Sequence, residues 1–236
     1  MKNPNLDIFK KAVRILGPLS DEMVFLGGCA TGLLLTDPAA PPIRVTDDVD
    51  AIVEAASLAK YYQLADRLRE RGFIEDKSLE APICRWRARG VVLDVMPTNP
   101  EILGFGNRWF GPAVAAAVRI ELHAGRLIRM VAAPYFLATK LEAFDGRGNE
   151  DYLISHDMED IIALMDGRAE IVEEVIGSSD DLKSYLAYRF AGLLEQPRFI
   201  EALPGHLPPD RASQGRLPML INRIRQIVGS EKGAAG

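Results

Sequence analysis

The chain has 236 residues, of which 48% are hydrophobic and 26% are charged, and its formal net charge is −5. This length suffices for one sizeable core, or for one domain with a smaller appendage, and the composition is that of an ordinary globular protein. No apolar run approaches membrane-spanning length, so we expect no membrane partner. The acidic balance argues against bulk electrostatic binding of duplex nucleic acid, but it is compatible with a local basic groove.

The cysteines and the N-terminal segment indicate the compartment. Neither Cys29 nor Cys84 belongs to a C-x-x-C pair, so we expect reduced thiols and a cytoplasmic protein. Residues 1–17 carry charges inside their apolar stretch, which is typical of an amphipathic helix rather than a signal peptide. The histidines are scattered, which argues against a zinc site.

The first three-fifths of the chain mixes short strands with helices. Apolar positions at helical spacing predict a helix over residues 6–16, and a short apolar strand follows at 23–26. The other elements predicted here are a helix over 29–35, a loop over 37–43, a strand over 49–53, a helix from Ser57 to about Arg71, and two hairpins, over 83–87 with 91–96 and over 118–122 with 127–131.

From about Pro134 the pattern is almost entirely helical, and Pro134 suits the first turn of a helix that runs to about Phe144. Further helices are predicted over 157–166, 169–176, 180–195 and 217–228, with a Pro/Gly-rich loop over 203–218. We therefore expect an α+β domain over 1–133 with a small mixed sheet, a helical C-terminal domain over 134–230, and a disordered tail over 231–236.

Two glycines, Gly27 and Gly28, stand between a predicted strand and a predicted helix. Without side chains, their backbone amides can approach an anion closely, and the start of a helix adds about half a positive charge there. The pair is therefore a candidate site for a triphosphate. A tight turn that binds nothing is the alternative for a Gly-Gly pair taken alone.

Asp48 and Asp50 lie two residues apart in a predicted strand, so both carboxylates point to one face while Val49 points into the core. Two carboxylates on one side repel each other unless a cation lies between them. Magnesium prefers carboxylates together with phosphate oxygens, so the pair is a candidate metal site. A solvated strand end is the alternative.

A third aspartate, Asp94, lies inside the apolar strand predicted over 91–96. Burying a lone carboxylate is costly unless it is paired or bound to metal. If this strand neighbours the one that carries Asp48 and Asp50, the three carboxylates form a cluster that can hold two metal ions. An aspartate at a strand end that accepts backbone hydrogen bonds is the alternative.

Together these residues resemble the DNA-polymerase-β-like nucleotidyltransferase superfamily. The string R-x-T-x-D-x-D runs from Arg44 through Thr46 to Asp50, and Asp94 follows as the late aspartate. Within the superfamily, the chain is most similar to the AbiEii and MenT type, which includes nucleotidyltransferase toxins of toxin–antitoxin systems. The resemblance covers roughly residues 20–166 and implies a mixed sheet with helices, followed by a helical part.

Residues 134–144 resemble the K-x-x-A helix of this family, with Lys140 as its lysine and Arg147 as the arginine that usually follows. Lys140 could neutralise triphosphate charge as a flexible point donor. An exposed helix lysine is the alternative, since that is the usual place of lysine.

Asp157 and Asp160 resemble the R-D-x-x-D motif of the family. They lie three residues apart and share one helix face, so either could orient a cation such as Lys140. The alternative is that they only stabilise the start of the helix, where negative charge interacts favourably with the helix dipole. The chain departs from the family pattern at His156, where an arginine is common, and in residues 146–155, which lengthen the preceding gap. These departures leave open which aspartate is functional.

Several other residues are weaker candidates. The resemblance places Arg44 at the nucleotide, Thr31 could donate to a phosphate from the first helical turn, and Thr46 could bind a phosphate or brace the loop.

Strand alternation would place the side chains of Arg85, Arg87 and Arg89 on one face, and that face could contact an RNA backbone. The alternative is a hairpin face that is exposed to solvent and binds nothing. Trp109 and Phe110 could stack on a base, but core packing is the stronger expectation.

The resemblance implies transfer of a nucleoside monophosphate from an NTP to a hydroxyl acceptor, with release of pyrophosphate. Mg²⁺ or Mn²⁺ would be the cofactor, held by Asp48, Asp50 and Asp94, and Lys140 would complete the catalytic set. Gly27 and Gly28 would cradle the phosphates.

The expected acceptor is RNA, such as a tRNA 3′ end, with toxicity as the consequence and a cognate antitoxin protein as a further partner. Two alternatives stay open. One is a nucleotidyltransferase of small molecules such as aminoglycosides, and the other is a non-catalytic nucleotide-binding interaction protein.

Overall fold

The computed structural model describes residues 3–123, 125–148 and 150–230 and divides into two compact units. The sheet unit comprises Asn3–Gly32 and Arg44–Ala132, and the helical unit comprises Leu33–Ile43 and the chain from Ala133 onward. The tail predicted over 231–236 lies outside the described residues. Within the described ranges, no helix has the length and apolarity needed to cross a membrane.

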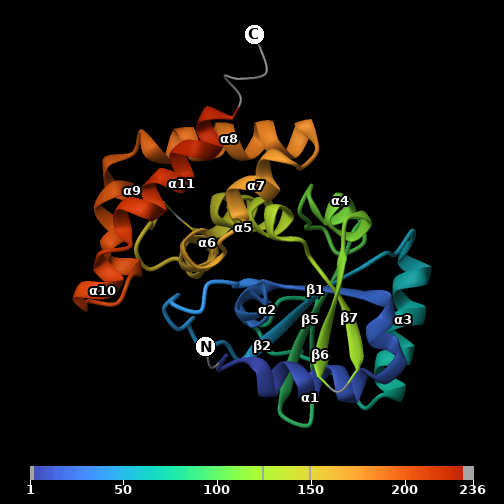
Figure 1. Cartoon of the computed structure of the whole chain (residues 1–236). Helices are drawn as coiled ribbons and strands as arrows, with labels where there is room; N and C mark the ends of the chain where they lie inside the picture. Colours follow the sequence, from blue (N-terminus) through green and yellow to red (C-terminus); the bar gives the residue numbers. More distant parts are fainter. Residues whose placement is uncertain (1–2, 124, 149, 231–236) are drawn as a thin grey trace. The chain divides into compact units, whose positions relative to one another are not determined.

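The sheet unit is built on a seven-stranded mixed sheet with the order β3-β4-β5-β2-β1-β7-β6 (Figure 1). The pairs β2–β5 and β1–β7 are parallel and the other pairs are antiparallel, so the expected mixed sheet is confirmed. The strands are β1 (Met23–Leu26), β2 (Asp48–Val53), β3 (Ile74–Glu75), β4 (Arg85–Ala88), β5 (Val91–Pro97), β6 (Val118–His123) and β7 (Arg126–Met130).

Two helices cover one face of this sheet, and Figure 1 shows α1 running across the strands. The ring of Phe9 on α1 (Leu6–Leu16) packs edge-on against Phe25 of β1, with ring centroids 5.0 Å apart. Arg69 of α3 (Leu58–Glu70) lies over the ring of Trp86, whose partner in the register is Leu93. Since these contacts fall on the apolar face, they leave the opposite face for the aspartates.

The remaining helical segments of the sheet unit are short. The 3₁₀ segment η1 (Gly17–Glu22) leads into β1, and α2 (Gly27–Leu34) begins directly at the two glycines. The sequence did not indicate the helix α4 (Phe110–Ala115), whose N-cap residue is Trp109. Both Trp109 and Phe110 are buried, as the core-packing expectation requires.

The helical unit confirms the predicted helical C-terminal part but corrects one segment. The prediction of a Pro/Gly loop over 203–218 is wrong, because η2 and α10 form within this segment. The side chain of Asp210 caps α10 by accepting hydrogen bonds from Ala212 N and Ser213 N. The helices are α5 (Ala133–Arg147), α6 (His156–Gly167), α7 (Ile171–Ile176), α8 (Asp180–Leu194), α9 (Pro197–Ala202), η2 (Leu203–His206), α10 (Arg211–Gln214) and α11 (Leu217–Gly229).

The segment 33–43 leaves the sheet unit and is fastened to the helical unit. The backbone amides of Thr36 and Asp37 both donate to Gly167 O, at 3.0 and 2.9 Å. Arg216 donates to the buried carboxylate of Asp166 at 2.8 and 2.9 Å and to Asp37 Oδ2 at 2.6 Å. The segment is therefore an integral part of the helical unit.

Candidate active site

The three aspartates singled out in the sequence lie on one face of two neighbouring parallel strands. In the register of β2 and β5, Asp50 pairs with Asp94, and Asp48 lies two positions earlier on β2. Paired residues share a face of the sheet, and residues two apart on a strand do so as well. The adjacency that the three-carboxylate prediction requires is therefore present.

Arg85 lies between these carboxylates. Its Nε donates to Asp94 Oδ1 at 2.8 Å, and its Nη2 donates to Asp94 Oδ2 at 2.7 Å and to Asp48 Oδ2 at 3.0 Å. The hydrogen bonds to Asp94 raise the pKa of Arg85 further above its usual range. A cationic side chain thus neutralises part of the acidic cluster.

The cluster matches divalent-metal chemistry only in part. Within the described ranges, no three His, Cys, Asp or Glu side chains are arranged to hold a metal ion together. The donors are nevertheless of the right kind, since Mg²⁺ and Mn²⁺ prefer carboxylate oxygens, and the site already attracts a cationic group. The chemistry of Asp48, Asp50 and Asp94 thus suits a metal, while in this structure Arg85 occupies part of their carboxylate face.

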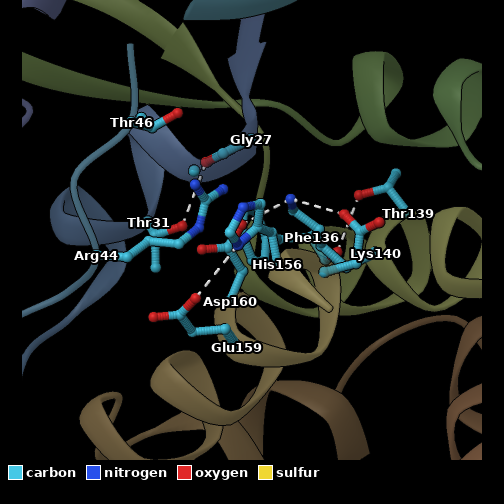
Figure 2. Close-up of polar contacts among 12 residues, drawn as sticks. Gly27, Thr31, Arg44, Thr46, Phe136, Thr139, Lys140, His156, Glu159 and Asp160 are labelled. Atoms are coloured by element: carbon cyan, nitrogen blue, oxygen red, sulfur yellow. Dashed lines mark hydrogen bonds and ion pairs between the residues drawn. The ribbon is translucent and has the colours of Figure 1, made fainter. Parts of the chain in front are cut away.

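The glycine turn directly adjoins Asp50. Leu26 at the end of β1 pairs with Asp50, and Gly27 follows with a positive φ of 77°. A Cβ at position 27 would lie 1.8 Å from Asp50 Oδ2, so only glycine fits. The first turn of α2 starts here, and Thr31 Oγ1 donates to Gly27 O at 3.2 Å (Figure 2).

The loop that carries Arg44 and Thr46 is held by a buried residue that the sequence did not single out. Asn5 Nδ2 donates to Arg44 O at 3.0 Å and to Gly28 O at 3.4 Å, while Asn5 Oδ1 accepts from Thr46 N at 3.1 Å. Thr46 Oγ1 in turn donates to Asp48 Oδ1 at 2.7 Å. One asparagine before α1 thereby links both loops of the site, and no local pattern announces that role.

Both cysteine thiols border the carboxylates and stay protonated at neutral pH. Burial, followed by the charges of Asp50 and Asp48, raises the pKa of Cys29 well above its usual range. Burial and then the charge of Asp94 raise the pKa of Cys84 to about 12. Near neutral pH both cysteines therefore favour the protonated, weakly nucleophilic thiol.

A second charged cluster lies inside the helical unit. Lys140 Nζ contacts Asp157 Oδ1 at 3.0 Å and Asp160 Oδ2 at 2.7 Å, and only 8% of Lys140 is exposed. Arg147 adds two hydrogen bonds to Asp157, at 2.7 and 2.8 Å. The alternative of an exposed helix lysine is wrong, because both aspartates pair with Lys140. Figure 2 shows Lys140 beside Asp160.

The electrostatics of Asp157 follow from these contacts. Burial raises its pKa, but the hydrogen bonds from Arg147 and the charge of Lys140 outweigh that effect and bring the pKa down to about 2. His156, the position at which the sequence resemblance leads to the expectation of an arginine, is exposed and lies 3.5 Å from Glu159.

The arginines proposed for RNA contact have other positions. Arg85 binds Asp94 and Asp48, and Arg87 Nε donates to Asp76 Oδ2 at 2.6 Å. Arg89 lies in the turn of the β4–β5 hairpin with a positive φ of 49°. Two of the three guanidinium groups are thus committed to carboxylates within the sheet unit.

No protein-family model and no curated protein sequence matches the chain. Solved structures do match its fold. JHP933 from Helicobacter pylori covers 100% of this chain and 97% of its own length, with 16% identity and a TM-score of 0.52. A candidate nucleotidyltransferase from H. pylori covers 99% of both chains, with 14% identity and a TM-score of 0.51.

An antigenic nucleotidyltransferase-like protein from Paracoccidioides brasiliensis is a more distant match, with 19% identity and a TM-score of 0.46 over 86% of this chain and 93% of its own. At these identities the comparisons establish the fold: a mixed sheet with helices and a helical C-terminal part, shared along nearly the whole chain with a candidate nucleotidyltransferase.

Proposed function

We propose that the protein is a nucleotidyltransferase, which moves a nucleoside monophosphate from an NTP to a hydroxyl acceptor and releases pyrophosphate. The observation that carries this proposal is the placement of Asp48, Asp50 and Asp94 on one sheet face, directly beside a glycine turn that opens a helix. The shared fold is consistent with this activity.

Each residue of the sheet unit would have a distinct role. Asp48, Asp50 and Asp94 would hold Mg²⁺ or Mn²⁺, which when bound activates the acceptor hydroxyl and stabilises the leaving pyrophosphate. Gly27 and Gly28 would present backbone amides at the start of α2 to the triphosphate. The hydrogen bond from Thr46 fixes the carboxylate of Asp48, and that loop would place Arg44 at the nucleotide.

The reaction balances without a further reactant. The acceptor oxygen forms a bond to the α-phosphorus as the bond from that phosphorus to the bridging oxygen breaks, and pyrophosphate leaves with the electron pair. The acceptor proton passes to a carboxylate oxygen of Asp94 and from there to water. Positioning and fixed charges supply most of the rate gain in such a transfer.

For the helical unit, we infer that Lys140 supplies positive charge to the triphosphate, as the family resemblance implies. Asp157 and Asp160 orient its ammonium, and Arg147 holds Asp157 in place. Because Lys140 contacts both aspartates, Asp157 and Asp160 would position its ammonium together.

RNA is the acceptor that we propose first, with Mg²⁺ as cofactor and a toxin role checked by a cognate antitoxin. A small-molecule acceptor is the second candidate, because the net charge of −5 suits a polycation such as an aminoglycoside.

Mass spectrometry would separate these acceptors. Total RNA and a panel of aminoglycosides would each be incubated with every NTP and Mg²⁺, and the products would be examined for the added mass of a nucleotide.

The variants Asp48→Asn and Asp50→Asn control this experiment. We expect both to abolish transfer while the melting temperature stays equal or rises, because each removes one of several repelling carboxylates. Transfer at the wild-type rate in either variant would show that the carboxylate site is not the catalytic one.

A further inference from the structure

Arg85 is placed to compete with any cation for the carboxylate face. It lies on β4 directly opposite Asp94, and its guanidinium reaches both oxygens of Asp94 and one of Asp48. The two-pronged contact with Asp94 is the strong geometry of an arginine–carboxylate pair. Most of the Arg85 side chain is shielded from solvent, which limits screening by salt.

The charge of the cluster explains why an internal cation is needed. Three carboxylates on one face repel one another, and Arg85 supplies the guanidinium that pairs with two of them. The oxygens that Arg85 contacts, Asp48 Oδ2 and Asp94 Oδ2, belong to carboxylates that the proposed function assigns to a metal. One oxygen cannot keep its short contact with Nη2 and also bind a cation on the same side.

We propose that Arg85 is an internal counter-cation, which holds Asp48 and Asp94 in the metal-free protein and releases them when these carboxylates bind a divalent cation. Arg85 thereby sets a threshold for metal binding, so that the metal-free site stays ordered while weakly bound ions are rejected. The proposal concerns regulation of the same site and rests on the proposed function.

Metal binding without nucleotide tests the proposal directly. Mn²⁺ alone would be titrated into the full chain and followed by the electron paramagnetic resonance signal of free Mn²⁺. We expect Arg85→Met to bind Mn²⁺ about tenfold or more tightly than wild type, since charge-assisted hydrogen bonds of this kind no longer oppose binding. Arg85→Lys should lie between them, because it keeps the charge but loses the fork.

Arg87→Met is the matched control. Arg87 lies on the same strand two residues away, and its ion pair goes to Asp76 instead of the carboxylate face. This variant should bind Mn²⁺ like wild type. In the metal-free state Arg85→Met should also melt at a lower temperature than Arg87→Met, and saturating Mn²⁺ should raise its melting temperature by more.

The outcomes separate this proposal from the proposed function. Equal or weaker Mn²⁺ binding by Arg85→Met, with binding still lost in Asp48→Asn, overturns the role of Arg85 and leaves the metal site intact. Absence of Mn²⁺ binding in every variant removes the metal site itself. If Arg85→Met does not fold, the Mn²⁺ affinity of Arg85→Lys decides the question. An affinity of Arg85→Lys for Mn²⁺ that is no tighter than that of wild type overturns the proposal.

A different observation indicates a separate anion site at the outer edge of the sheet unit. Arg119 of β6 and Arg129 of β7 stand directly opposite each other, an arrangement in which like charges destabilise the sheet. Within the described part of the chain neither has an ion-pair partner, and Arg129 donates only to the backbone of Val114 at 3.0 Å. Both line a hollow of about 430 Å³ together with Arg126 and Asp21.

The hollow is basic within an acidic protein. Arg126 is anchored by Gly17 O at 3.0 Å and by an ion pair with Asp21, so the acidic side chain of the lining already pairs with a third arginine. Through the register β6–β7–β1–β2, these two arginines lie on the same sheet face as Asp50. The geometry points to a phosphate-binding site, with the phosphate supplied either by a polynucleotide backbone or by a free phosphate ion.

Two ligands distinguish those sources. A labelled ten-nucleotide RNA would be titrated by fluorescence anisotropy, and inorganic phosphate by calorimetry. If the ligand is RNA, Arg119→Ser/Arg129→Ser should weaken binding and reduce the log–log salt slope by about 1.4, which corresponds to roughly 0.7 per lost contact. The control Arg87→Ser/Arg89→Ser removes two arginines from the same unit and should leave affinity unchanged.

If wild type binds inorganic phosphate but not RNA, and Arg119→Ser/Arg129→Ser loses the phosphate binding, the site belongs to the free ion. Equal affinity of wild type and the Arg119/Arg129 variant for both ligands overturns the site. Neither outcome depends on nucleotidyl transfer, so failure here is distinct from failure of the proposed function.

Discussion

Lys140 is the residue whose structure departs most from ordinary lysine behaviour. Its ammonium lies between two buried carboxylates, and its removal would leave both without this counter-charge. We expect Lys140→Met to lower the free energy of unfolding by about 3–5 kcal/mol, which is the usual effect of breaking a buried ion pair on one side. Urea denaturation followed by circular dichroism measures this.

A second lysine serves as control. Lys183 pairs with Asp180 one helical turn earlier, and that carboxylate is almost fully exposed. Lys183→Met should therefore change the unfolding free energy by less than about 1 kcal/mol. Equal midpoints for the two lysine variants would mean that Lys140 is not held as the structure indicates.

The low pKa of Asp157 makes part of the stability dependent on pH. The pKa is about 2 in the folded protein and about 3.8 when unperturbed, so the ionised carboxylate stabilises the fold above about pH 4. The contribution, about 2 kcal/mol, is lost as the pH falls through 2. The stability difference between wild type and Asp157→Asn should therefore shrink between pH 4 and pH 2, and a constant difference would contradict this assignment.

At this scale the sequence predicted residue types better than environments. Period-two spacing was enough to place Asp48 and Asp50 on one face of their strand. Asp94 lies beside them because its strand, β5, is the neighbour of β2, which was the condition set for a three-carboxylate cluster. The burial of Lys140 and the roles of Asn5 and Arg85 depend on partners far away in the chain, for which local spacing carries no information.

Among the elements, the turn from β1 into α2 has the strictest steric requirement. Gly27→Ala would place a methyl group against Asp50 and force a positive φ on a residue with a Cβ. We expect the variant to lose about 2 kcal/mol or more of stability, together with the proposed transfer activity. Thermal unfolding and the mass-spectrometric assay measure the two effects.

Gly111→Ala is the matched control for this turn. Gly111 lies in α4 without a positive φ, and an added Cβ meets nothing within 4 Å. That variant should fold and react like wild type or gain slight stability. Normal stability of Gly27→Ala would show that the Gly27 turn relaxes easily.

Elements with a clear apolar period or turn signal were predictable, whereas several short elements without one were not. The helix over 6–16 and both hairpins formed where apolar spacing and turn residues indicated them. In contrast, β3, α4, α9 and α10 span only two to six residues, which is too short for a period to emerge. Their formation depends on tertiary packing and on caps such as Asp210.

At the scale of the whole molecule, the fold class followed from the sequence, whereas the choice between the proposed acceptors did not. A mixed sheet before a helical region is encoded in the order of strand and helix patterns along the chain. The acceptor proposed above rests on no local pattern of the sequence, because the contacts that would select it depend on how side chains are arranged in space.

The fastening of residues 33–43 predicts how fragments behave. A fragment of residues 133–230 would lack the chain that binds Gly167 O and the Asp37 partner of Arg216. We expect it to be poorly folded by itself and to gain helical signal when a synthetic peptide of residues 33–43 is added. A fragment with full helicity and no response to the peptide would contradict this.

The same segment limits how such a protein can evolve by recombination. The chain crosses between the units after residues 32, 43 and 132, and the first crossing falls inside α2. A single genetic exchange near residue 132 would therefore combine one parent's helices with the other parent's 33–43 segment. Chimaeras would keep a native-like helical unit only if the inherited pieces still matched at Asp37, Asp166 and Arg216, so we expect these positions to be inherited as a set.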